Sequence, residues 1–144
     1  MARRDPRPYI YTGLDVAFAV VYIAAIELVI PTRFASNQVH LWSLPIGTLI
    51  MALGTASIAA PRLRTAGRWI AIAGGSLVLL STILLIARVL VSAAFLAGVY
   101  GAFGKAAASF ALVAVALVVE IVALLPIVQV KYLMSRAGKL AYAA

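Results

Sequence analysis

Charged side chains stand inside stretches of this sequence that are otherwise apolar, and their chemistry is the first thing to explain. These residues are Asp15, Glu27, Arg88 and Glu120. A charge within hydrocarbon is costly, so such residues are usually paired, hydrogen-bonded or exposed to a water-filled pathway, where they relay protons or ions. What each side chain faces therefore decides whether it has a structural or a functional role.

Glu120 lies in the middle of the apolar stretch 106–130. Counting 1.5 Å per residue back from Lys131 places it about 16 Å from the nearer boundary, which is the middle of a bilayer. Its carboxyl group is expected to be protonated and hydrogen-bonded, to face a cation of another subunit, or to line a water-filled path. The nearby hydrogen-bonding groups are backbone carbonyls and the hydroxyls of Thr55, Ser81 and Thr82. Pro126 predicts a bend just below Glu120, because proline removes a helical donor.

Glu27 and Arg88 are predicted to form an ion pair in the outer leaflet. Residue counts from the cytoplasmic ends place them at similar depths, about 25 Å and about 28 Å from the inner boundary. A guanidinium group stays charged when buried and can bond a carboxylate through two donors. The alternative is that each side chain extends separately to the outer headgroups.

Asp15 is expected near the inner boundary, on one helix face together with three aromatic residues, Tyr11, Phe18 and Tyr22. This face predicts a hydrogen-bonded seam against a neighbouring helix, with Lys131 or Tyr132 as the partner. A ligand-binding role for the same face is the alternative.

Composition excludes several kinds of site. The chain has no cysteine and one histidine, His40, so thiolate metal sites, iron–sulfur clusters, histidine-rich metal sites and haem held by two histidines are excluded. The sequence contains no phosphate-binding glycine loop, nucleophile elbow or pair of catalytic carboxylates. We therefore expect no cofactor and no metal, and we rank an enzyme acting on lipid below other functions.

Long apolar runs must position the charged residues. Of the 144 residues, 65% are hydrophobic and 11% are charged, which is typical of a chain dissolved in lipid. Runs at about 10–30, 41–60, 69–97 and 106–130 predict four transmembrane helices in a single domain, residues 1–144. Small residues at helical spacing and a helix-bending proline mark the expected packing positions: Gly47, Gly54, Gly75 and Pro126. The predicted fold is an all-α membrane protein, an antiparallel four-helix bundle.

The third run is longer than one crossing needs. Residues 70–103 would extend about 50 Å as a straight helix, whereas the hydrocarbon core is about 30 Å thick. The segment 89–104 is therefore either an apolar outer segment that lies at the headgroups or docks on a partner, or the continuation of a long tilted helix.

Basic residues predict the orientation. Nine of the 12 lie in the N-terminal head, the middle loop and the C-terminal tail: Arg3, Arg4, Arg7, Arg62, Arg64, Arg68, Lys131, Arg136 and Lys139. Because cytoplasmic loops carry an excess of Lys and Arg, both termini are expected in the cytoplasm. The formal charge of +8 is thus a topology signal and does not indicate nucleic-acid binding. The composition is compatible with a GC-rich bacterial genome, so we expect the bacterial cytoplasmic (inner) membrane.

Two classes of function remain open. The first is an integral membrane subunit or scaffold of a larger membrane complex, because no site chemistry or soluble domain is visible. The second is a small oligomeric transporter or ion channel, in which Glu120 couples to a proton or cation. The expected partners are the lipid bilayer and either other membrane subunits or further copies of this chain.

Overall fold

Helices form all the secondary structure in the computed structural model, which describes residues 5–29 and 35–143, with side chains for 5–28 and 41–143. The long helices are α1 (Arg7–Val29), α2 (Ala35–Ala56), α3 (Arg64–Val99) and α4 (Gly101–Met134). Two 3-10 turns, η2 (Ser57–Ala59) and η3 (Pro61–Leu63), connect α2 to α3, and the short α5 (Arg136–Ala141) follows α4. Four segments are long and apolar enough to cross a membrane, which indicates a multi-pass helical membrane protein.

Several helix ends lie beyond the predicted spans. α1 already begins at Arg7 and includes Pro8, because proline is tolerated in the first helical turn, where its missing N–H leaves no bond unmade. Residues 89–99 continue α3 as a helix, which corresponds to the long-helix alternative for that segment. The predicted end of the first span, Ile30, and the side chain of His40 lie outside the described residues.

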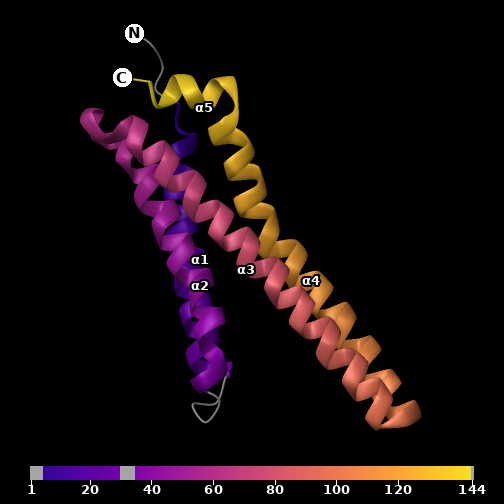
Figure 1. The fold of residues 1–144 in the computed structure, drawn as a ribbon. Coiled ribbons are helices and arrows are strands. Elements are labelled where there is room, and N and C mark those ends of the chain that lie inside the picture. The colour runs from indigo at the N-terminus through magenta and orange to yellow at the C-terminus, as the bar shows by residue number, and fades with distance from the viewer. Residues whose placement is uncertain (1–4, 30–34, 144) are drawn as a thin grey trace.

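The long helices form two hairpins that meet at one end of the molecule and diverge toward the other (Figure 1). α1 packs on α2, α2 on α3, and α3 on α4. α3 crosses α2 near the end where the termini lie, and the α3–α4 hairpin then runs away from α1 and α2. The structure therefore differs from a bundle that is compact along its whole length, because the four helices come together only near the termini.

Helix length is consistent with this divergence. α1 has 23 residues, or about 34 Å, close to the thickness of the hydrocarbon core. α3 and α4 have 36 and 34 residues, or about 54 Å and about 51 Å. A tilt of about 40°, the upper end of the usual range, would leave them about 40 Å along the membrane normal. That height equals the hydrocarbon core plus its headgroup layers.

The turn between α3 and α4 requires glycine at two positions. Gly101 has a φ of 56°, the only positive φ among the described residues, and other L-residues avoid that region. At Gly104, a Cβ atom would collide with the carbonyl oxygen of Leu96. The two helices therefore approach each other at backbone distance immediately after the turn.

Glycines also bring α2 and α3 into backbone contact. A Cβ atom on Gly54 would lie 2.6 Å from the carbonyl oxygen of Gly67, and one on Gly74 would lie 2.8 Å from that of Gly47. Such contacts let two helices pack closely in lipid, where apolar burial gives no advantage over the lipid itself. Gly75 performs a similar role toward α4, since its Cβ atom would lie 2.5 Å from Cγ2 of Val130.

The buried core lies at the end of the molecule where the chain termini are found. α5 lies across this end (Figure 1). Its first turn is capped by Ser135, whose Oγ accepts a 3.2 Å hydrogen bond from the backbone N–H of Gly138. The buried apolar cluster beneath it comprises Met51, Ile58, Ala71, Tyr132, Leu133 and Tyr142.

Candidate functional site

Asp15 is completely buried between helices and is the most enclosed of the charged candidates. Its Oδ2 accepts a 2.7 Å hydrogen bond from Nε2 of Gln129 on α4. The hydroxyl of Thr55 on α2 donates a longer hydrogen bond, 3.5 Å, to the same oxygen. Asp15 therefore joins three helices. The predicted partners are not used, because Lys131 is exposed and Tyr132 bonds a different carboxylate.

Hydroxyl groups extend this polar cluster toward the end of the molecule that carries the termini. Thr55 accepts a 2.9 Å hydrogen bond from the hydroxyl of Thr12, and its backbone carbonyl accepts a 3.1 Å bond from the phenol of Tyr142. Burial raises the pKa of the Tyr142 phenol, so this group stays neutral and acts as a donor. The Asp15 cluster, defined here as Asp15, Thr12, Thr55, Gln129 and Tyr142, thus connects α1, α2, α4 and the residue after α5.

Two buried atoms of the Asp15 cluster lack a hydrogen-bond partner in the described part of the chain. They are Oδ1 of Asp15 and Oε1 of Gln129, on side chains with 0% exposure. Sequence reasoning did not single out Gln129. The available signal was its amide, the one carboxamide in the otherwise apolar stretch 106–130.

Glu120 lies on the surface of α4. Of its three expected environments, the hydrogen bond to a hydroxyl of Thr55, Ser81 or Thr82 is not formed. Glu120 is exposed and makes no side-chain hydrogen bond or ion pair with any described residue. It is one of the residues that line an open apolar groove of about 330 Å³ between α3 and α4. The groove is lined by Ile86, Val89, Leu90, Leu112, Val115, Ala116, Val119 and Glu120.

Glu27 and Arg88 do not form the predicted ion pair. Both side chains are exposed, and Arg7–Asp5, at 3.9 Å, is the one ion pair formed between described residues. Similar residue counts along the two helices do not bring these side chains together, because α3 diverges from α1 toward this end (Figure 1). Pro126 lies within α4, which stays helical through it, and is buried.

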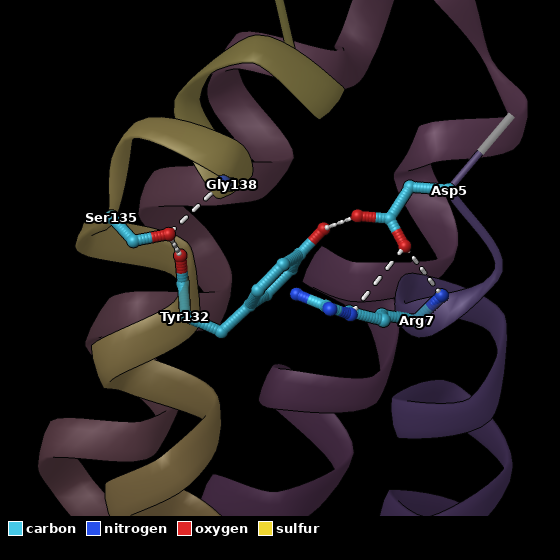
Figure 2. A network of polar contacts seen from close by, with 5 residues as sticks. All are labelled: Asp5, Arg7, Tyr132, Ser135 and Gly138. Atoms are coloured by element: carbon cyan, nitrogen blue, oxygen red, sulfur yellow. Dashed lines mark hydrogen bonds and ion pairs between the residues drawn. The ribbon is translucent and has the colours of Figure 1, made fainter. Parts of the chain in front are cut away.

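A second polar group joins the N-terminal segment to the end of α4 (Figure 2). The phenol of Tyr132 donates a 2.7 Å hydrogen bond to Oδ2 of Asp5, and the backbone N–H of Arg7 donates a 3.0 Å bond to Oδ1. Burial opposes ionisation of Asp5, but these bonds and the charge of Arg7 outweigh it and lower the pKa of Asp5. This carboxylate is therefore ionised and structurally bound at neutral pH.

Basic residues gather around the same end of the molecule. They belong to the start of α1, to η3 and the start of α3, to the end of α4 and to α5: Arg7, Arg62, Arg64, Arg68, Lys131, Arg136 and Lys139. Arg68 also has a structural role, because its Nε donates a 2.9 Å hydrogen bond to the carbonyl oxygen of Leu133 near the end of α4. The described residues contain no cluster of three or more His, Asp or Glu side chains that could hold a metal ion.

Comparisons of the chain with models of protein families, with curated protein sequences and with solved structures give no match. What the fold defines is therefore a class, a helical membrane protein with four candidate spans. Its polar features include the buried Asp15 cluster, the contact between Asp5 and Tyr132, and the exposed carboxyl group of Glu120.

Proposed function

We propose that this protein is an integral membrane subunit or scaffold that docks another membrane polypeptide on its α3–α4 hairpin. The observation that supports this proposal is the exposed side chain of Glu120, which lines the apolar groove and has no partner among the described residues. A carboxyl group on a lipid-facing surface is costly. A partner helix that offers a cation or a hydrogen-bond donor at that depth removes this cost.

The remainder of α4 fits such a docking face. In the most apolar stretch of α4, only 6% of the residues are buried by the rest of the chain, whereas 50% are buried in the corresponding stretch of α2. Large apolar side chains surround Glu120, among them Leu117, Ile121 and Leu124, which are 57%, 62% and 60% exposed. Exposed apolar residues are ordinary in lipid, so it is the carboxyl group among them that points to a protein partner.

The proposed location is the bacterial cytoplasmic membrane, with the basic end of the molecule and both termini in the cytoplasm. The support is the gathering of basic residues at one end, because positively charged segments are retained on the cytoplasmic side. The turn between α3 and α4 would then lie at or beyond the outer surface.

Site-specific cross-linking in native membranes tests the docking proposal. A photoreactive amino acid at Ile121, which is 62% exposed beside Glu120, should give an adduct with one discrete membrane polypeptide. The matched control is Val20 on α1, which is 61% exposed and should give no such adduct. Equal adducts at both positions, or adducts with lipid alone, would contradict the proposal.

The second candidate function is a small homo-oligomeric transporter or channel. The same exposed carboxyl group favours it, since copies packed through α4 would place several Glu120 side chains along one path. In this case the Ile121 adduct is a second copy of this chain. Purified protein in liposomes should then conduct protons or cations, and Glu120→Gln should abolish that flux.

A further inference from the structure

The Asp15–Gln129 contact joins α1 to α4, two helices that each pack mainly on a different neighbour. α1 packs mainly on α2, and α4 packs mainly on α3, yet Nε2 of Gln129 lies 2.7 Å from Oδ2 of Asp15. Both side chains are 0% exposed. The contact is thus a specific link between the two hairpins, near the end where they meet.

The unpaired atoms in this contact are of one kind. Oδ1 of Asp15 and Oε1 of Gln129 are both oxygens, and both lack a partner among the described residues. An ionised carboxylate can only accept hydrogen bonds, and so can the carbonyl oxygen of an amide. With Asp15 ionised, the pair would therefore leave two buried acceptors without a donor, which native proteins avoid.

A single proton satisfies both atoms. When Oδ1 carries a hydrogen it becomes a donor, and Oε1 is the unmatched acceptor on the same side chain that bonds Oδ2. A carboxylic acid and a primary amide then form two antiparallel hydrogen bonds, N–H to Oδ2 and O–H to Oε1. The observed 2.7 Å bond is the first of these two.

The groups around Asp15 do not supply a compensating charge. α2 presents the hydroxyl of Thr55, α4 presents the amide of Gln129, and the titratable neighbours are the phenols of Tyr22 on α1 and Tyr142 after α5. Within the described ranges, no Lys or Arg forms an ion pair with Asp15. A buried carboxyl group without a cation favours its neutral form.

We propose that Asp15 is a proton-binding site within the membrane, and that its bound proton is shared with Gln129 to join α1 to α4. The proton lies on Oδ1 and is donated to Oε1, and its release leaves two opposed acceptors that separate the helices. This site is independent of the docking role proposed for Glu120. Glu120 is exposed and has no partner among the described residues, whereas Asp15 is enclosed.

Infrared spectroscopy of the full chain tests this directly, because Asp5 and Asp15 are its two aspartates. Protein labelled with ¹³C-aspartate and reconstituted in vesicles should show an isotope-shifted carbonyl band of a protonated carboxyl group at neutral pH. The band should persist in Asp5→Asn and disappear in Asp15→Asn. Absence of a labelled band at neutral pH would overturn the proposal, and so would its loss in Asp5→Asn.

Two further measurements distinguish the proton from other occupants. In Gln129→Leu the labelled band should move to higher frequency, because the carboxyl group loses both of its bonds to Gln129 and keeps only the 3.5 Å contact from Thr55. A band unchanged in position would overturn the pairing with Gln129. Replacing potassium by sodium should leave the wild-type band unchanged, whereas its loss in sodium would show a cation site instead. Asp15→Asn can form the same two bonds through its amide, so it should fold even where Gln129→Leu does not. In that case the labelled bands of the wild type and of Asp15→Asn decide whether Asp15 carries a proton.

Discussion

The phenolic oxygen of Tyr132 lies 2.7 Å from Oδ2 of Asp5, a residue 127 positions away in the chain. This bond fixes the segment before α1 against the last turns of α4 (Figure 2). The guanidinium carbon of Arg7 also lies 5.8 Å from the centre of the Tyr132 ring. The Asp5–Tyr132 and Asp15–Gln129 hydrogen bonds are thus two polar links to α4, one from the segment before α1 and one from α1 itself. Both lie near the end of the molecule where the termini are found.

The Asp5–Tyr132 bond predicts a measurable dependence of stability on acid. Because the pKa of Asp5 is lowered in the folded protein, its contribution is present above the unfolded value of about 3.9 and is lost as the pH falls through the folded value. Tyr132→Phe should lower the free energy of unfolding at neutral pH by about 1 kcal/mol. It should also flatten the loss of stability in acid.

Thermal unfolding in detergent, followed by circular dichroism, checks this prediction. Tyr100→Phe is the matched control, since Tyr100 is 60% exposed at the α3–α4 turn and should tolerate the change. Equal effects of the two substitutions at neutral pH would show that the Asp5–Tyr132 bond contributes nothing.

The glycine contacts between α2 and α3 predict a sharp contrast between two Gly→Ala substitutions. A Cβ atom at Gly54 would lie 2.6 Å from the backbone oxygen of Gly67, so Gly54→Ala forces the helices apart. We expect a loss of about 1–3 kcal/mol, the usual cost of overpacking. Gly13 on α1 has nothing within 4 Å of its Cβ position, so Gly13→Ala should be neutral or stabilising. Unfolding temperatures that change equally in both variants would rule out the close contact.

Much of this architecture follows from the sequence, because apolar length and small-residue spacing are local properties. Four spans are required by four apolar runs, and the glycines of the second span stand at helical intervals that leave one face without side chains. Gly47 and Gly54 do lie on that face, against α3.

Apolar length and small-residue spacing do not determine how the helices are placed relative to one another. Residue counting assumes parallel helices, so it places Glu27 and Arg88 at similar depths although α3 diverges from α1. The rotation of α4 was also undetermined, since a helix that is apolar on every side has no polar face to orient it. For this reason the sequence alone does not show that Gln129 faces the neighbouring helices or that Glu120 is exposed.

The proposed orientation predicts which ends of the molecule can be labelled from outside the cell. The chain has no cysteine, so single-cysteine variants need no background substitutions. A maleimide that cannot cross membranes should label Ala102→Cys, at the exposed α3–α4 turn, on intact cells. Ala143→Cys, exposed beside α5, should react only after the cells are opened. The reverse pattern would invert the orientation, and labelling of both on intact cells would mean that the termini and the turn are not separated by the membrane.

Asp15 and Glu120 should respond in opposite ways to the same apolar substitution. Asp15→Leu removes the acceptor of the Gln129 bond inside a buried cluster, so the isolated protein should lose about 2 kcal/mol or more of unfolding free energy. Glu120→Leu removes a group that has no partner among the described residues, so the isolated protein should keep or gain stability. The same Glu120→Leu change should abolish the adduct formed from Ile121 in native membranes, because the partner loses its polar contact. Unfolding temperatures of the purified variants, read beside their cross-linking yields, separate a residue that stabilises the fold from one that serves association. A Glu120→Leu protein that is destabilised when purified alone, yet cross-links normally, would reverse the two assignments.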